Sequence, residues 1–345
     1  MVEQVTIAVD AMGGDRAPES IVHGCLDALA ADPALRLLLV GRPDAVEPLL
    51  AGAPRDRLEV VAAPDVVGMD ESPGLALRRK PEASVAVCAR LLAERRAQAV
   101  VSAGSTGALV AATLFAAKLL PGVARPGIAA TFPTARGPVV LCDVGANIQP
   151  KPLHLLQYAV MASAFSEHVL GVERPRVGLL NIGTEEHKGS AEVRDARKLL
   201  DEAGAAGVLR FIGSVEGNHI FEGEADVVVC DGFVGNTVLK TAEGVGRALG
   251  EQFVRACRSD AGGDPAEAAF LERGLTRLER IMDWAETGGA PVLGVDGCVV
   301  AAHGRSDRRA IRHAVRVAAE FAQRDVNGRI AERLAGLAGS SAARA

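Results

Sequence analysis

One stretch near the middle of the chain, from Arg176 to Gly189, most constrains the fold. Its first part, Arg176 to Ile182, is an apolar run of strand length that breaks at Gly183. Ligands of open α/β sheets bind outside the carboxyl ends of the strands. The stretch therefore predicts either a strand end that faces a ligand or a solvated strand-to-helix loop. Four polar residues of this loop precede the next helical pattern: Glu185, Glu186, His187 and Lys188.

The alternation of apolar runs and helical patterns continues along most of the 345 residues. Few hairpin signals occur between the runs, so we expect an α/β fold, a three-layer α/β/α unit with a mainly parallel sheet covered on both faces. Strands are expected at 4–10, 35–40, 58–63, 99–102, 127–132, 138–142, 176–182, 208–212, 225–230, 291–293 and 298–302. Helices are expected at 19–31, 44–51, 81–96, 108–120, 152–169, 190–203, 237–257, 264–287 and 306–324.

The domain organisation follows from where this alternation is interrupted. We expect a single α/β unit over residues 1–334, with a helical excursion over about 244–287. Asp264, Pro265 and Glu267 combine an N-cap, a first-turn proline and an acidic third position, which predicts that a helix starts there. The tail, 335–345, is rich in Ala, Gly and Ser and is expected to be disordered.

Composition narrows the possible partners and the location. Aromatic residues make up only 3% of the chain, which argues against a nucleic-acid surface of rings stacked on bases. The net charge of −5 provides no global basic field, so an acidic partner would need a local basic patch. No signal peptide is visible, and the longest apolar helical stretch contains Lys118 and is too short to span a bilayer. We therefore expect a cytoplasmic protein.

Several common site motifs are missing from the sequence. The six cysteines are scattered singly and the seven histidines show no metal spacing, which predicts buried thiols and no metal. No G-x-x-x-x-G-K-[ST] or G-x-S-x-G pattern occurs, and Met12 to Asp15 follow the first strand in place of G-x-G-x-x-G. A P-loop, a nucleophile elbow and a Rossmann dinucleotide site are therefore not supported.

Instead, several predicted strands end in a polar loop that contains glycine. The loop Ser102–Gly107 opens a helix, so its amides and the helix dipole could hold an anion. A strand-to-helix turn with a hydroxyl cap explains this one loop equally well. Half a dozen such loops together predict a shared crevice. The other loops are Asp10–Asp15, Asp143–Asn147, Asn181–Lys188, Glu216–Asn218 and Asp231–Asn236.

These loops closely resemble the motifs of the PlsX family, the phosphate acyltransferases of bacterial phospholipid synthesis. The resemblance runs in order from Ile7 to about Asp325. It implies a fold related to phosphotransacetylase and to the isocitrate/isopropylmalate dehydrogenases. The matching segments are Val9–Asp15, Ser102–Ala108, Asp143–Asn147, Asn181–Gly189, Glu216–Asn218 and Asp231–Asn236.

The resemblance also implies an activity and partners. The family transfers a fatty acyl group from acyl-carrier protein to inorganic phosphate, and the acyl phosphate product feeds a downstream membrane acyltransferase. It is homodimeric, uses no metal or cofactor, and associates loosely with the membrane surface. One motif departs from the family pattern, because Ser105 stands where Asn usually precedes Thr. Serine still offers a hydroxyl donor, but with less reach.

The chemistry of such a reaction predicts which residue types the site needs. A phosphate oxygen attacks a thioester carbonyl and a thiolate leaves, so the site must bind a dianion and stabilise an oxyanion. Lys188 fits the cation, and Asn218 and Asn236 fit the neutral donors. Asp231 and Asp143 would orient these groups. The expected substrate-binding residues are Gly104, Ser105, Thr106, Gly107, Asp143, Asn147, Asn181 and His187.

Two other classes of function stay open on the residues alone. A nicotinamide-dependent dehydrogenase on the related fold would need a cluster of metal-binding carboxylates, which is not apparent here. A non-catalytic scaffold would bind acyl-carrier protein or a membrane. The helical excursion would contact a second subunit, which we favour, or lie on a membrane surface. Two basic patches are candidates for an acidic carrier: Arg78, Arg79 and Lys80, or Arg308, Arg309 and Arg312.

Overall fold

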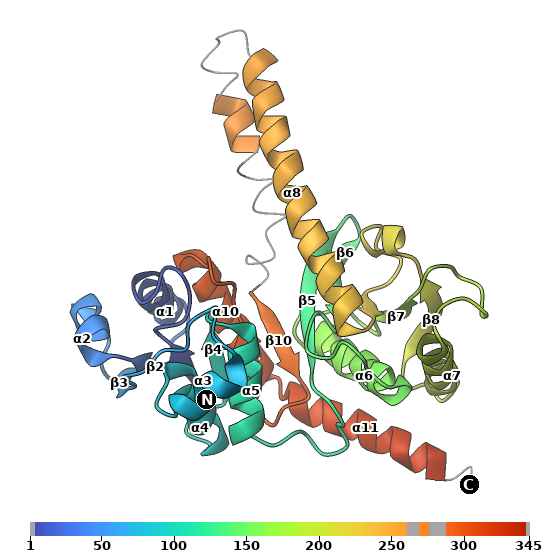
Figure 1. Ribbon diagram of the computed structural model, residues 1–345, viewed down its shortest axis with the longest axis horizontal. Helices are drawn as coiled ribbons and strands as arrows, with labels where there is room; N and C mark the ends of the chain where they lie inside the picture. Colours follow the sequence, from blue (N-terminus) through green and yellow to red (C-terminus); the bar gives the residue numbers. More distant parts are fainter. Residues whose placement is uncertain (1–3, 261–268, 275, 277–287, 343–345) are drawn as a thin grey trace.

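The computed structural model describes residues 4–260, 269–274, 276 and 288–342 (Figure 1). Within these residues the strands form a single sheet of 11 strands. In sheet order they are β3 (Leu58–Ala62), β2 (Leu35–Gly41), β1 (Val5–Asp10), β4 (Ala99–Ser102), β11 (Cys298–Ala301), β10 (Ala290–Leu293), β5 (Gly127–Thr134), β6 (Gly137–Cys142), β9 (Val227–Val229), β7 (Arg176–Leu180) and β8 (Arg210–Val215).

The sheet is parallel in its two outer parts and antiparallel only in its centre, among the described strands. β3, β2, β1, β4 and β11 pair in parallel, as do β6, β9, β7 and β8. Between them, β10 is antiparallel to both β11 and β5, and β5 is antiparallel to β6. The two parallel parts therefore run in opposite directions along the sheet.

Strand register nevertheless brings the carboxyl ends of the two parts together. Ala301, the last residue of β11, pairs with Ala290 of β10. Val292 of β10 pairs with Ile128 of β5 in antiparallel register, so Ala290 lies level with Ala130. Ala130 in turn pairs with Leu141, near the end of β6. The ends of β11 and β6 thus lie near one row across the sheet. This is the switch point at which open α/β sheets bind ligands.

Helices cover both faces of the sheet and complete three layers, as expected from the sequence (Figure 1). Because both faces are buried, strands such as β1 and β2 are apolar on both sides rather than alternating. One layer contains α1 (Glu19–Ala31), α6 (Pro152–His168), α7 (Ala191–Ala205), α10 (Arg308–Gln323) and α11 (Val326–Ala342), with α2 (Pro43–Val46) and the 3-10 helix η1 (Glu47–Leu50) at its edge. The other contains α3 (Pro73–Arg79), α4 (Ser84–Ala93), α5 (Thr106–Ala116), the 3-10 helix η2 (Gly217–Ile220) and the start of α8 (Gly232–Asp260).

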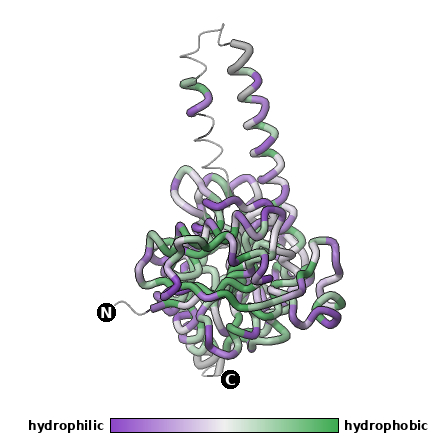
Figure 2. The backbone as a smooth tube through the Cα atoms, turned by 90° about the vertical axis from the view of Figure 1, so that its left-hand side faces the viewer, coloured by the Kyte–Doolittle hydropathy of each residue, from purple (hydrophilic) through white to green (hydrophobic). Residues whose placement is uncertain are grey.

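The long helix α8 begins in the second layer and then rises away from the body of the molecule (Figures 1 and 2). Three large apolar side chains lie exposed on its projecting part at a spacing of four residues: Val245, Leu249 and Phe253. This is the first arm of the expected helical excursion, and much of the second arm lies outside the described residues. None of the described helices has the length and apolar character needed to cross a membrane.

Three elements differ from the sequence-based expectation. β5 and β6, expected only as two successive apolar runs of a mainly parallel sheet, form an antiparallel hairpin with a turn at residues 135–136. The segment Pro73–Arg79, for which no element was expected, is helix α3. The tail expected to be disordered from Ala335 is the second half of α11, which continues to Ala342. That helix is held to the body because Ile330 and Leu334 are buried against it.

Five of the six cysteines are buried as free thiols, which agrees with the expectation of buried thiols: Cys25, Cys88, Cys142, Cys230 and Cys298. Burial raises the pKa of each of these thiols, because the apolar surroundings disfavour the thiolate. The side chain of Cys257 lies outside the described residues. These thiols are therefore poor nucleophiles and contribute to packing.

Candidate active site

A cavity of about 610 Å³ opens at the switch point of the sheet. Its size falls within the range of small-molecule sites in proteins. The start of α5, the loop after β6, one face of α8 and the residues after β11 surround it. The glycines and the polar side chains of the lining are Gly104, Thr106, Gly107, Gly145, Asn236, Lys240, His303 and Gly304; the apolar residues are Met69, Val110, Ala111, Leu114, Ile128, Ala130, Val144, Ala146, Leu239, Ala290, Ala301 and Ala302.

The first turn of α5 presents unused backbone donors to this cavity. Ser105 caps the helix, and its hydroxyl accepts from the amide of Ala108 at 3.4 Å. The amide of Gly104 is bonded to the hydroxyl of Ser102 at 3.1 Å. Among the described residues, the amides of Thr106 and Gly107 have no such partner. Since a helix N-terminus carries partial positive charge, these two amides form a place for an anion.

The buried carboxyl group of Asp143 shapes the loop after β6. It accepts hydrogen bonds from the amides of Ile128, Gly145, Ala146 and Asn147 at 2.7–3.1 Å. Burial raises the pKa of Asp143, while these amides work in the opposite direction. The side chain of Asn147 donates to the carbonyl of Pro126 at 2.6 Å. Both expected site residues therefore support the wall of the cavity from behind, and neither side chain lines it.

Among the residues that the structure describes, the first backbone amides of α8 already have hydrogen-bond partners, in contrast to those of Thr106 and Gly107 in α5. The carboxylate of Asp231 accepts from the amides of Phe233 and Val234 at 2.9 and 2.8 Å. The amide of Gly232 donates to the carbonyl of Asn147 at 2.8 Å, which ties α8 to the loop after β6. Asp231 is thus a helix cap, and α8 contributes side chains rather than amides to the site.

One face of α8 carries Asn236, Leu239 and Lys240 into the cavity wall. Asn236 was expected from the sequence, whereas Lys240 was missed. The ammonium group of Lys240 pairs with Glu243 at 3.1 Å and remains half-exposed. Residues three and four apart lie on the same face of a helix, so the spacing from Asn236 was the available signal for Lys240.

His303 is a second lining residue that sequence reasoning missed. It follows the end of β11, and its Nδ1 accepts from the amide of Arg305 at 3.1 Å. Burial lowers the pKa of His303, so the imidazole is neutral at pH 7. Its neighbour Gly304 accepts from the amide of Asp15 at 2.7 Å, which joins the loop after β1 to this edge. The position of His303 directly after a strand was the only sequence signal for it.

The loop that contains Lys188 lies along the same edge of the sheet but outside the cavity lining. β9 separates β7 from β6, so the ends of β7 and β6 are about 10 Å apart at the usual strand spacing. The side chain of Asn181 bonds to the carbonyl of Lys188 at 3.2 Å and to Ser214 at 3.4 Å, so Asn181 holds this loop in shape. Lys188 is half-buried and His187 is exposed.

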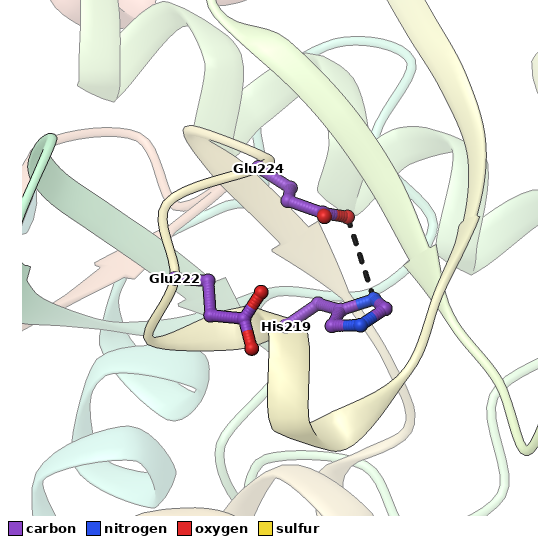
Figure 3. Close-up of side chains that lie close together, drawn as sticks. All are labelled: His219, Glu222 and Glu224. Atoms are coloured by element: carbon purple, nitrogen blue, oxygen red, sulfur yellow. Dashed lines mark ion pairs between the residues drawn. The ribbon is translucent and has the colours of Figure 1, made fainter.

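Asn218 is exposed on the 3-10 helix η2 after β8, and it also lies outside the cavity lining. Beside it, His219, Glu222 and Glu224 bring potential metal-binding atoms within 4.8 Å of one another (Figure 3). The imidazole of His219 approaches the carboxylate of Glu224 at 3.4 Å. Both glutamates are exposed, and such surface groups commonly occur without an ion. We therefore assign no metal to this cluster.

Solved structures and known proteins match this architecture along almost its whole length. A phosphotransacetylase from Streptococcus pyogenes superposes with a TM-score of 0.63 at 16% identity, covering 93% of this chain and 94% of that one. The EutD phosphotransacetylase from Staphylococcus aureus gives 0.60 at 18% identity, covering 93% and 96%. At these identities the likeness concerns the fold alone. The fold is therefore of the phosphotransacetylase type, as the resemblance in the motifs implied.

Sequence relatives identify the family. The model of a family described as fatty acid synthesis protein matches residues 5–329. A phosphate acyltransferase from Heliobacterium modesticaldum is 49% identical over 334 residues, covering 96% of this chain and 98% of the relative. One from Pseudomonas putida is 44% identical over 331 residues, covering 95% and 97%. The chain belongs to this family, the PlsX family of phosphate acyltransferases, and it is an acyltransferase of fatty acid and phospholipid synthesis.

Proposed function

We propose that the protein transfers a fatty acyl group from acyl-carrier protein to inorganic phosphate in the 610 Å³ cavity. The observation that carries this proposal is the division of the cavity into a polar and an apolar part. Two free amides and the ammonium group of Lys240 lie in the polar part. The apolar part continues along α5 and the sheet centre, where an acyl chain can be buried.

Phosphate would bind at the N-terminus of α5, against the amides of Thr106 and Gly107. Lys240 would supply a point charge from α8, and Lys188 would supply a second one from the loop after β7. Helix amides and lysine ammonium groups are both suited to a dianion, and together they hold it without a metal ion. This arrangement leaves one phosphate oxygen free to point towards the thioester.

The reaction would proceed by direct attack of that oxygen on the thioester carbonyl carbon. The C–O bond forms first and gives a tetrahedral oxyanion, which the side-chain amide of Asn236 would stabilise as a neutral donor. The C–S bond then breaks, and the carrier leaves as a thiolate that takes a proton from solvent. Thiolates are good leaving groups, so the mechanism needs no strong general acid, and the neutral imidazole of His303 is available to orient phosphate.

The acyl chain would lie against the outer face of α5. Val110 and Leu114 are one helical turn apart on this face, and Ala111 lies beside them. Leu239 from α8 and Ile128 from β5 complete the apolar wall. Leu114 is partly exposed and would form an apolar entrance at the rim of the cavity.

The acidic carrier would dock on α3, next to this entrance. α3 packs against α5, and the side chains of Arg78 and Arg79 at its end are exposed. Met69, just before α3, lines the cavity and is also exposed. The alternative patch on α10 is less suitable, because Arg308 is already paired with Asp27. An exposed basic patch beside an apolar entrance fits an acidic protein that delivers a lipid chain.

A homodimer with weak membrane contact belongs to the same proposal. The exposed stripe of Val245, Leu249 and Phe253 on the projecting part of α8 supports packing against the same stripe of a second copy. Such a stripe would otherwise be left in water. The chain would then act as a cytoplasmic enzyme that touches the membrane surface, where a downstream acyltransferase receives the acyl phosphate.

The decisive experiment measures free carrier thiol and acyl phosphate after mixing acyl-carrier protein thioester with the enzyme. Thiol release that depends on phosphate, with one acyl phosphate formed per thiol, is the expected result. Release that continues without phosphate would instead indicate a thioesterase, and no release would favour a binding scaffold. A Lys240→Met variant tests whether the activity arises in the cavity, because it should need more phosphate for the same rate of thiol release.

A further inference from the structure

A second cavity, of about 340 Å³, lies at the opposite edge of the sheet from the candidate active site. Arg174 and Pro175 immediately precede β7, and Leu209 and Arg210 lie at the start of β8, so the cavity is at the amino-terminal ends of these strands. β7 has five residues, which separates this edge from the Lys188 loop by about 16 Å. The helices α6 and α11 close the cavity, and the full lining is Ser163, Glu167, Arg174, Pro175, Gly207, Val208, Leu209, Arg210, Arg333 and Gly336.

The charged side chains around this cavity are mostly arginines. Arg333, on α11, pairs with Glu167 of α6 at 2.5 Å, which leaves other N–H groups of its guanidinium unused. Arg174 and Arg210 form no ion pair within the part of the chain that the structure describes. The lining therefore has an excess of positive charge, although the protein as a whole is net negative.

A buried hydroxyl group without a partner also lines the cavity. Ser163, on α6, is 2% exposed, and its Oγ has no hydrogen-bond partner. Burying a hydroxyl group without a partner is unfavourable, so most buried hydroxyls are bonded. A ligand that accepts a hydrogen bond from Ser163 would remove this cost. The hydroxyl group thus points to a ligand independently of the arginines.

We propose that this cavity binds a phosphate group, as inorganic phosphate or as part of a phosphomonoester. The guanidinium groups of Arg174, Arg210 and Arg333 offer planar pairs of N–H donors that match phosphate oxygens, and Ser163 donates a further bond. Two unpaired arginines balance the two charges of a phosphate dianion. The cavity is roomier than phosphate alone requires, and Pro175 and Leu209 supply apolar walls for an organic group. The site is separate from the phosphate position proposed for catalysis.

Arginine footprinting of the full-length protein tests this proposal at single residues. The protein is treated with phenylglyoxal at constant ionic strength, with chloride, inorganic phosphate or phenyl phosphate, and each modified arginine is quantified by peptide mass spectrometry. We expect saturating phosphate to slow modification of Arg174 and Arg210 by about 5-fold or more. Arg316, an exposed arginine paired with Glu320 on α10, is the internal control and should change less than about 2-fold.

The two phosphate sources are separated by comparing the concentrations that give half-maximal protection. If phenyl phosphate reaches half-maximal protection at a lower concentration than inorganic phosphate, the site binds a phosphomonoester. If it needs an equal or higher concentration, the site binds the free ion. If each of Arg174 and Arg210 is modified at the same rate in chloride as in either phosphate, the proposal is overturned. Because the readout is at these two arginines, phosphate in the catalytic cavity does not affect the conclusion.

A pair of serine variants on one helix separates a binding role from a structural one. Ser163→Ala removes the hydroxyl group from the cavity wall and should raise the half-protecting phosphate concentration by about 10-fold, the scale for a hydrogen bond to a charged group. Ser166→Ala removes another buried, unpartnered hydroxyl from α6 that does not line the cavity, and it should change nothing. Equal effects of the two variants would show that neither hydroxyl contacts the ligand and would overturn the assignment of Ser163.

Discussion

The hydroxyl group of Ser102, at the end of β4, donates a 2.7 Å hydrogen bond to the buried carboxyl group of Asp10, at the end of β1. The same oxygen of Ser102 accepts from the amide of Gly104, which lines the cavity. The two strand-end loops also pack closely, because a Cβ on Gly13 would lie 2.6 Å from the carboxylate of Asp10 and 2.7 Å from the amide of Gly104. Asp10 therefore holds the glycine loop of the site from behind.

An Asp10→Asn variant should change the pH dependence of stability. Burial raises the pKa of Asp10 above 3.8, because desolvation disfavours the carboxylate more than Ser84, Ser102 and the nearby amides favour it. Asp10 therefore contributes stability that is fully present below pH 3.8 and is lost as the pH rises through its raised pKa. The free energy of unfolding of the wild type minus that of Asp10→Asn should decrease with rising pH and then level off. Urea unfolding at several pH values measures this difference, and a constant difference would contradict the prediction.

A Gly235→Ala variant should be strongly destabilised. A Cβ at this position would lie 1.9 Å from the carbonyl oxygen of Asp143, so α8 would have to move away from the loop after β6. Overpacking of this kind typically costs about 1–3 kcal/mol, occasionally more. Gly244→Ala, on the same helix with open space around it, is the matched control and should be neutral or stabilising by up to about 1 kcal/mol. The urea concentration at the unfolding midpoint should therefore fall clearly in Gly235→Ala and stay constant or rise slightly in Gly244→Ala.

Most helices and strands could be predicted from the sequence, because the spacing of apolar residues, every second residue in a strand and about every 3.6 residues in a helix, is a local property. β4 and α1 have the bounds that these patterns predict. The second half of α11 could not be predicted, because its Ala, Gly and Ser residues have no clear amphipathic pattern and the helix depends on contacts with α6, including the pair of Arg333 with Glu167. The β5–β6 hairpin was missed because Thr134 and Gly137 give only a weak turn signal.

The site was predicted less completely than the fold. The candidate cavity lies at strand ends, and among the expected residues those of the α5 loop and Asn236 line it. Asp143, Asn147 and Asp231 were also noticed, but their contacts show that they shape backbone rather than face the cavity. A polar residue after a strand can serve either purpose, and the sequence does not tell which. Lys240 was missed because it lies in the third turn of α8, away from the strand ends.

Reversing charge on α3 should weaken docking of the acidic carrier. Arg78→Glu with Arg79→Glu should raise the KM for acyl-carrier protein by at least about 10-fold and reduce its dependence on salt, since steering by exposed charges is screened. The kcat should change little, because these side chains are exposed and outside the cavity lining. Arg312→Glu with Arg316→Glu on α10 is the control. An unchanged KM in the α3 variant, or an equal rise in both, would reject α3 as the docking site.

Narrowing the apolar part of the cavity should change the preference for acyl chain length. Ala111→Phe adds a ring where the chain is proposed to lie, and each methylene excluded from burial costs about 0.8 kcal/mol. Exclusion of two methylenes should lower kcat/KM for a long-chain thioester about 10-fold relative to a short-chain one. Phe115→Leu, an exposed change on α5 outside the cavity, should leave this ratio unchanged. Equal ratios in Ala111→Phe and wild type would place the acyl chain elsewhere.

The two lysines proposed to contact phosphate should differ in their kinetic effects. Lys188→Met and Lys240→Met keep most of the side-chain stem and remove the charge, and Lys198→Met, exposed on α7, is the control. Both variants should stay folded, because neither ammonium group is buried in the core. If Lys188 stabilises charge that develops in the transition state, its loss should lower kcat by about 10²–10³, the scale for one preorganised donor. If Lys240 mainly binds ground-state phosphate, its loss should raise the phosphate KM while kcat stays constant. Near-wild-type kcat and KM in folded Lys188→Met would remove that residue from the mechanism and leave the α5 amides and Lys240 as the phosphate site.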